Sequence, residues 1–216
     1  MLKRLELNMS KILEAIKILK GEECEIPNVG RDDLPEFFKE MGFKVGVEIG
    51  VAKGEYTETL CKAGLKVYGV DPYLSYPGYD NPGVQDRLDK EYEEAKQRLA
   101  PYDCEIIRKK SVDAAEDFED GSIDFVYIDG HHEFKFVAED IWFWSKKVKK
   151  GGVISGHDFV NSSVKTGPYV CHVKQVVRGY TNAHQIRNWY VLGRHHFPDD
   201  IEELRDKWRS WMWINQ

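Results

Sequence analysis

The chain has 216 residues, of which 31 are lysine or arginine and 37 are aspartate or glutamate, so its formal net charge is −6 at pH 7. This length suits one α/β domain with a substantial core and is too short for two large domains. The acidic balance disfavours a broad phosphate-binding surface, and we expect no nucleic-acid partner.

The spacing of the cysteines and the length of the apolar runs indicate in which cellular compartment the protein is located. The four cysteines are far apart and form no C-x-x-C pair, which argues against a zinc cluster or a disulfide framework. Residues 1–23 lack the continuous apolar core of a signal peptide, and no segment has the roughly 20 apolar residues that a membrane span needs. We therefore expect a cytoplasmic protein that does not associate with a membrane.

The N-terminal part is predicted to be helical. Residues 2–20 carry apolar side chains at mostly helical spacing, which predicts an amphipathic helix that covers the core or forms a homodimer contact. A polar, turn-rich stretch continues through Gly30, and "DDLPEFFKEMG" then predicts a short helix with an acidic start and a glycine stop. We assign residues 1–43 to an N-terminal helical cap and residues 44–216 to the main domain.

From residue 44 onward, strand-like and helix-like segments alternate. This order requires right-handed crossovers and a parallel sheet that is covered on both faces. The fold class is therefore α/β, with a Rossmann-like doubly wound sheet. Strands are predicted at 44–49, 66–71, 104–108, 123–128 and 152–156, and helices at 55–63, 84–98, 112–118 and 134–148.

The pattern is less regular after residue 157. A helix is predicted around 170–180, and "HQIRNWYVLGR" suits a tight antiparallel hairpin that turns at Arg187 and Asn188 on one edge of the sheet. The tail "KWRSWMWINQ" is rich in tryptophan. We expect it to fold back onto the far face of the sheet, with a homodimer contact as the alternative.

The stretch "VEIGVAKGEYT" joins the first strand of this series to the following helix through Gly50 and Gly54. A helix N-terminus offers unpaired N–H groups and a partial positive charge to a ligand. The turn lacks the G-x-G-x-x-G triad of dinucleotide folds, so NAD is not predicted. Glu48 would attract an ammonium group or a ribose hydroxyl, and Asp71 in "VYGVDPY" can accept both ribose hydroxyls. These features describe an adenosine that bears a positively charged amino-acid arm.

Acids and histidines follow two other strands. The strand at 123–128 leads into Asp129, His131 and His132, and the strand at 152–156 leads into His157 and Asp158. Because adjacent parallel strands lie about 5 Å apart, these side chains crowd one edge of the sheet. Crowded carboxylates are costly unless a cation compensates them, and carboxylate oxygens suit Mg²⁺.

Four motifs in this order resemble the class I S-adenosylmethionine (SAM)-dependent methyltransferases: "VEIGVAKGEYT", "VYGVDPY", "DFVYIDGHHEF" and "KKVKKGGVISGHDF". The nearer resemblance is to the small-molecule O-methyltransferase branch, which includes catechol, caffeoyl-CoA and macrolide-sugar O-methyltransferases and cephalosporin-hydroxylase-like proteins. It covers about residues 44–160. It implies about seven strands, mostly parallel with an antiparallel edge strand, and transfer of a methyl group from SAM to a hydroxyl oxygen of a small-molecule acceptor.

The resemblance also assigns the cofactor residues. The first turn would hold the methionine end of SAM, with Glu48 facing its ammonium group, and Asp71 would hold the ribose. Ser111 would contact the adenine edge, with Asp113 as a further candidate, and Ser111 also fits a helix N-cap. The residues assigned to SAM are Glu48, Gly50, Val51, Gly54, Asp71, Pro72, Ser111, Val112 and Asp129.

Metal and catalytic roles follow in the same way. Metal-dependent catechol-type enzymes supply an Asp and then an Asp-Asn pair from the corresponding strand ends, and the present pair is His157-Asp158 or Asp158-Phe159. We assign the metal to Asp129, His157 and Asp158, with Asn161 as an alternative ligand. An imidazole ligand admits Mn²⁺, Fe²⁺, Ni²⁺ or Zn²⁺ as readily as Mg²⁺.

His132 occupies the position of the family's base lysine, and His131 competes with it for this role. Residues 73–83 and 160–170 are candidate lids over the site. Two alternatives stay open. One is a nucleic-acid base methyltransferase, which the acidic charge disfavours together with the missing Asn/Asp-Pro-Pro-aromatic run. The other is a SAM-binding relative that has lost methyl transfer.

Overall fold

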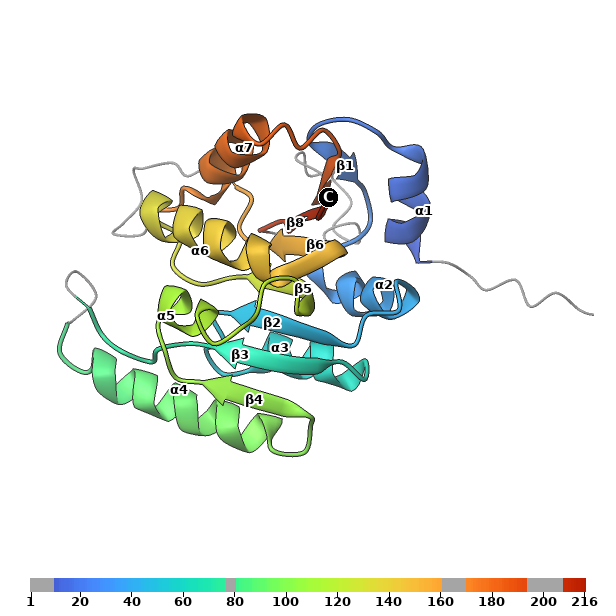
Figure 1. Ribbon diagram of the computed structural model, residues 1–216. Helices are drawn as coiled ribbons and strands as arrows, with labels where there is room; N and C mark the ends of the chain where they lie inside the picture. The colour runs from blue at the N-terminus through green and yellow to red at the C-terminus, as the bar shows by residue number, and fades with distance from the viewer. Residues whose placement is uncertain (1–9, 77–80, 161–169, 194–207) are drawn as a thin grey trace, which may run out of the picture.

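The computed structural model describes residues 10–76, 81–160, 170–193 and 208–216 (Figure 1). The expectations for residues 2–9, for Asn161 and for most of the second candidate lid lie outside these ranges. None of the described helices is both long and apolar enough to cross a membrane.

One sheet runs through the centre of the described structure. Its strands are β1 (Cys24–Ile26), β2 (Val45–Ile49), β3 (Lys66–Val70), β4 (Cys104–Ile107), β5 (Ile123–Ile128), β6 (Val148–Gly156), β7 (Trp189–Leu192) and β8 (Trp211–Ile214). Their order in the sheet is β1-β7-β8-β6-β5-β2-β3-β4. All neighbouring pairs are parallel except those of β8, which is antiparallel to both β6 and β7.

Helices cover both faces of the sheet (Figure 1). They are α1 (Lys11–Ile18), α2 (Leu34–Glu40), α3 (Glu55–Lys62), α4 (Val84–Leu99), α5 (Ser111–Ala115), α6 (Phe134–Lys147) and α7 (Val173–Ala183), with a 3₁₀ helix η1 (Arg31–Asp33) before α2. One core cluster joins α5, α6 and α7 to the sheet, and a second joins α1, α2 and α3 to the opposite face. The predicted Rossmann-like α/β class is confirmed.

The alternating segments between residues 44 and 156 form the predicted strands and helices, with small shifts at their ends. The last of these strands begins at Val148, four residues earlier than expected, and the short helix after β4 ends at Ala115. The antiparallel strand is present near one edge of the sheet, with β7 and β1 lying outside it.

Three C- and N-terminal features differ from the prediction. Arg187 and Asn188 do not turn a hairpin, because they precede β7 and the antiparallel partner of β7 is β8. The tryptophan-rich tail does not lie on a face of the sheet but enters it as β8, and Trp211 and Trp213 are buried. The N-terminal segment is not entirely helical, because it also contains the strand β1, which pairs with β7.

Candidate functional site

The turn between β2 and α3 surrounds a buried acid. Glu48 is the penultimate residue of β2, and its carboxyl group accepts a hydrogen bond from the hydroxyl of Thr57 on α3. Burial raises the pKa of Glu48 well above its ordinary range, although the bond from Thr57 and the charge of Arg31 oppose this shift. An ammonium group placed beside Glu48 would favour its ionised form.

The two glycines of this turn lie in close contact with other parts of the chain. Gly50 has a φ of 89°, and a Cβ atom at this position would lie 2.2 Å from the carbonyl oxygen of Asp129. Gly54 has a φ of 75°, caps the N-terminus of α3 and lies against Leu99 of α4. Gly50 therefore lets the ends of β2 and β5 approach each other closely.

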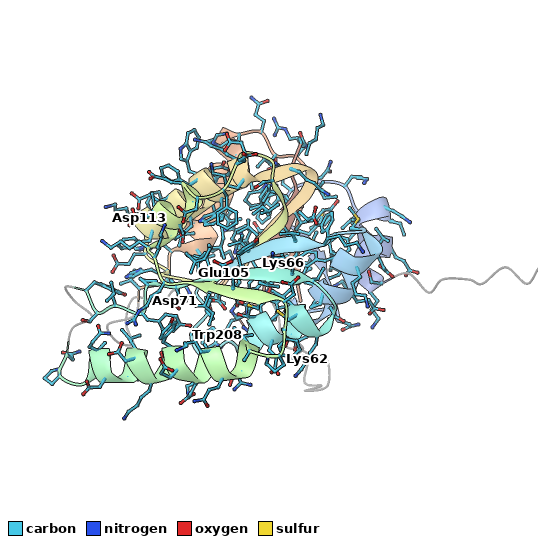
Figure 2. All side chains as sticks on the ribbon, turned by 60° about the horizontal axis from the view of Figure 1, so that its bottom comes forward. Lys62, Lys66, Asp71, Glu105, Asp113 and Trp208 are labelled. Atoms are coloured by element: carbon cyan, nitrogen blue, oxygen red, sulfur yellow. The ribbon has the colours of Figure 1, made fainter. Side chains whose placement is uncertain are left out.

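Asp71 ties the ends of β2 and β3 together (Figure 2). Its Oδ2 atom accepts hydrogen bonds from the backbone N–H groups of Val51 (3.0 Å) and Ala52 (3.1 Å), and its Oδ1 atom accepts one from Tyr73 (2.9 Å). Burial raises the pKa of Asp71, and these three bonds offset part of the rise. A carboxylate has about four acceptor sites, so Asp71 keeps capacity for a ribose hydroxyl.

The adenine-edge candidates lie on α5 and face in different directions. The hydroxyl of Ser111 accepts a hydrogen bond from Nε1 of Trp144 (2.8 Å) and bonds the carboxyl group of Asp140, both on α6. The N-cap of α5 is Lys110, so the predicted N-cap role of Ser111 is wrong. Val112 is half-buried, and Asp113 is exposed (Figure 2). Ser111 thus anchors α5 to α6.

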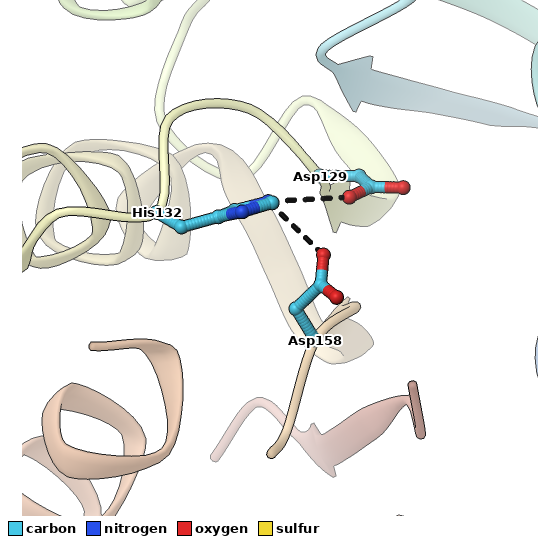
Figure 3. A group of neighbouring side chains, drawn as sticks. All are labelled: Asp129, His132 and Asp158. Atoms are coloured by element: carbon cyan, nitrogen blue, oxygen red, sulfur yellow. Dashed lines mark ion pairs between the residues drawn. The ribbon is translucent and has the colours of Figure 1, made fainter. Parts of the chain in front are cut away.

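A second group of side chains lies where β5 and β6 end (Figure 3). Asp129, His132 and Asp158 offer ligand atoms that all lie within 4.8 Å of one another. Nε2 of His132 lies 3.0 Å from Oδ2 of Asp158 and 3.6 Å from Oδ1 of Asp129. This nitrogen is buried and makes no hydrogen bond with the described residues. The three groups form a compact site that a cation would suit.

The charges of this group shift its pKa values. Burial raises the pKa of Asp129, and the neighbouring charge of Asp158 adds to the rise. Burial alone would lower the pKa of His132, but the two carboxylates outweigh it and the net shift is upward. The site therefore attracts positive charge, either a proton on His132 or a metal ion.

The other two histidines are placed differently. His157 is buried, and its Nδ1 atom lies 3.6 Å from Asp129 and 3.5 Å from Asp158, so it borders the same carboxylates without joining the compact group. His131 turns toward aromatic rings, with its ring centre 5.0 Å from that of Tyr76 and 4.3 Å from that of Phe136. His132, not His131, faces the carboxylates.

One charged residue of this region was not predicted. Arg31 of η1 lies 3.6 Å from Oδ2 of Asp129 and 5.3 Å from the ring centre of Tyr56, whose hydroxyl donates to the carbonyl oxygen of Arg31 (2.8 Å). The N-terminal segment therefore brings a cation to the end of β5. No motif marks Arg31 in the sequence, because it precedes the first recognisable strand–turn–helix unit by more than ten residues.

Comparison with known proteins identifies the family of this chain. Residues 47–159 match a family model described as a methyltransferase domain, which is more than half of the chain. The chain belongs to this methyltransferase family. No curated protein sequence matches it.

Solved methyltransferase structures share the fold. An O-methyltransferase from Bacillus cereus in complex with SAH is 15% identical and covers 86% of this chain and 80% of its own, with a TM-score of 0.58. The O-methyltransferase TomG from Streptomyces achromogenes, in complex with SAM, is 13% identical over 86% and 79%, with a TM-score of 0.56. An rRNA methylase from Streptococcus thermophilus is 15% identical over 84% and 93%, also with a TM-score of 0.56. At these identities the likeness establishes the fold alone, and the acceptor must be argued from the site.

Proposed function

We propose that this methyltransferase uses SAM to methylate a hydroxyl oxygen of a small molecule, with assistance from a divalent metal ion. The observation that carries the proposal is the meeting of two groups at one edge of the sheet. Glu48 lies near the end of β2 and Asp71 directly follows β3, and the compact group of Asp129, His132 and Asp158 follows β5 and β6. In open α/β sheets ligands bind outside the carboxyl ends of the strands.

The residues of the first group fit SAM. Glu48 would balance the ammonium group of the methionine arm, since a buried carboxyl group gains most from an adjacent cation. Asp71 would accept a ribose hydroxyl while holding the turn through Val51 and Ala52. Pro72 and Val112 would border the nucleoside. Asp129 would border the cofactor on the β5 side, because its backbone lies close to Gly50.

The residues of the second group fit a divalent metal ion. The buried Nε2 atom of His132 faces the carboxylates of Asp129 and Asp158, so a cation among these groups would meet one imidazole and two carboxylate ligands. We assign Asp129, His132 and Asp158 as ligands and place His157 beside them. When bound, SAM supplies the electrophilic methyl group and the metal supplies a Lewis acid that orients the acceptor oxygen.

His132 has an alternative role. If it does not bind the metal ion, we propose that it removes the proton from the acceptor hydroxyl. His131 is less suited, because its Nδ1 atom already accepts a hydrogen bond from the backbone N–H of Glu133 (3.2 Å). Its neighbours Tyr76 and Phe136 instead suit apolar contact with a ligand. The metal content of a His132 variant distinguishes a metal ligand from a proton acceptor.

The acidic net charge of −6 supports a small acceptor over nucleic acid, although an rRNA methylase shares the fold. We retain residues 44–216 as the catalytic domain, a cytoplasmic location and a homodimer through α1 as proposals. For the dimer, the exposed side chains of Ile18 on α1 and Trp208 near the C-terminus would contribute apolar contact area.

A calorimetric titration tests the proposal. The purified protein is titrated with SAM and, as a control, with NAD, each in the presence of Mg²⁺ or Mn²⁺ and again with EDTA. Micromolar binding of SAM without binding of NAD is the expected result. Absence of SAM binding in every condition would overturn the proposed function.

A further inference from the structure

Three cations surround one buried phenylalanine next to the candidate metal site. Phe159 directly follows Asp158 and is 1% exposed. Nζ of Lys174 lies 5.2 Å from its ring centre, and the guanidinium carbons of Arg209 and Arg178 lie at 5.9 Å and 6.0 Å. We call Lys174, Arg178 and Arg209 the cation cluster.

The cation cluster lies at the same edge of the sheet as the candidate active site. The backbone N–H of Phe159 donates to the carbonyl oxygen of Arg209 (3.0 Å), just before β8 begins. Across the sheet, Gly156 pairs with Trp211, Trp211 with Val191, and Val191 with Glu25. This row passes through the last residue of β6, so the cluster adjoins the two metal-ligand strand ends on the side of β7 and β1.

The positive charge of the cluster exceeds its compensation among the described residues. Arg178 pairs with Glu23 through two contacts of 2.6 Å and 2.7 Å, and Arg209 pairs with Glu25 at 2.6 Å. Lys174 is only 4% exposed, yet it forms no ion pair or hydrogen bond within the described part of the chain. Its ammonium group lies over the face of Phe159, and Glu23 and Glu25 act on it only through longer-range charge, without a direct ion pair within the described residues.

Two further observations favour an anion beside these side chains. Nε of Arg209 is buried and has no hydrogen-bond partner among the described residues, which leaves one donor of its guanidinium unused. Lys174 belongs to the first turn of α7, where no acidic side chain is present and the helix N–H groups add positive character. Burial lowers the pKa of Lys174, and the charges of Arg178 and Arg209 lower it further, whereas the charges of Glu23 and Glu25 offset part of this shift. An oxyanion is the kind of partner that both the ammonium group of Lys174 and the Nε–H group of Arg209 would bind.

We propose that the cation cluster is a subsite for an anionic group, a phosphate or a carboxylate, carried by the methyl acceptor. The inference rests on the proposed function, because it places this group on the acceptor side of the site, beyond Asp158 and away from Glu48 and Asp71. It defines the substrate class as a hydroxyl compound that bears an oxyanion. The apolar ring of Phe159 would support the cations and would not contact the reacting atoms.

The test uses anion titrations of the full chain by calorimetry at constant ionic strength, with inorganic phosphate in one series and acetate in the other. Lys174→Met removes the charge of this lysine and keeps the apolar stem. Lys150→Met is the matched control, because Lys150 is exposed near the start of β6, at the opposite edge of the sheet. Lys174→Arg restores a cation and serves as the conservative variant.

We expect one anion to bind to the wild-type chain and to Lys150→Met with equal affinity, and at least tenfold more weakly to Lys174→Met, with recovery in Lys174→Arg. Preference for phosphate or for acetate identifies the type of group on the acceptor. Absence of binding by both anions, or equal binding to Lys174→Met, overturns the subsite. A parallel titration with SAM is expected to be unchanged in all variants, and a wild-type chain that fails to bind SAM contradicts the proposed function without affecting the anion result.

Discussion

His132 and Asp158 meet from two neighbouring strands, with Nε2 of the imidazole 3.0 Å from Oδ2 of the carboxylate. His132 lies four residues after the end of β5, whereas Asp158 lies two residues after β6. Asp158 adopts a left-handed backbone with a φ of 57°, which is uncommon for a residue with a side chain and is concentrated at functional sites. The backbone conformation of Asp158 and the position of His132 together create the compact acidic group.

A substitution of Asp158 tests whether the metal-binding group and the SAM-binding group are separate sites. Asp158→Ala is expected to abolish the effect of EDTA and of added Mn²⁺ on the enzyme while leaving the affinity for SAM within about twofold of wild type. Metal content by mass spectrometry and SAM affinity by calorimetry measure the two properties. Equal loss of SAM affinity in Asp158→Ala and in Asp71→Ala would show that the two groups are one site.

His132→Gln resolves the role of the imidazole. A variant that purifies without metal shows that His132 is a ligand, and a variant that retains metal but loses activity shows that it is the proton acceptor. In both cases the rate is expected to fall by about 10²-fold or more, the typical contribution of a positioned acid–base group. His131→Gln is the comparison variant, and an equal loss in it would contradict the assignment.

Asp71→Ala is expected to weaken SAM binding by at least tenfold. The substitution removes the proposed ribose contact and also leaves the N–H groups of Val51, Ala52 and Tyr73 without their acceptor, at about 1–3 kcal/mol for each group that stays buried. Glu36→Ala at an exposed position of α2 is the control and is expected to bind SAM normally. Calorimetry measures both, and unchanged binding in Asp71→Ala would exclude Asp71 from the cofactor site.

The region from β2 to β6 could be predicted from sequence, because its strands and helices alternate with clear glycine turns and apolar cores. β1 could not be predicted, since "CEI" is three residues long and its pairing with β7 depends on contacts far along the chain. The tryptophans of β8 gave a strong signal for burial and none for pairing. The sequence predicted that acids and histidines gather where β5 and β6 end, but it could not show that His132 forms the compact group with Asp129 and Asp158 while His157 borders it, because side-chain direction after a strand depends on loop conformation.

Two glycine variants test the close approach of β2 and β5. Gly50→Ala is expected to destabilise the fold by about 1–2 kcal/mol from its positive φ and by roughly 1–3 kcal/mol more from overlap with Asp129. Gly64→Ala has a similar φ of 85° but meets no atom within 4 Å, so only the first cost applies. Urea denaturation measures the difference in free energy of unfolding, and equal values for the two variants would refute the packing explanation.

The buried acid on α6 predicts a pH dependence of stability. Burial raises the pKa of Asp140 from 3.8 to about 7, so the folded chain holds this proton more tightly than the unfolded chain does. The contribution of Asp140 is therefore most favourable below about pH 4 and declines up to about pH 7, by on the order of 4 kcal/mol at most. Asp140→Asn is expected to flatten this part of the stability curve, measured by denaturation at several pH values. Asp113→Asn, which alters an exposed acid, is expected to leave the slope as in wild type.

The pairing of β1 with β7 constrains how the chain can be synthesised and divided. Cys24 is synthesised long before its partner Tyr190, so this edge of the sheet can close only after both segments have been made. A truncated chain that begins at residue 44 would leave the hydrogen-bonding groups of β7 open on one side, and such exposed edges promote association between molecules. The N-terminal segment therefore also protects the chain against aggregation, because its removal would expose the edge of β7 that β1 covers in the intact chain.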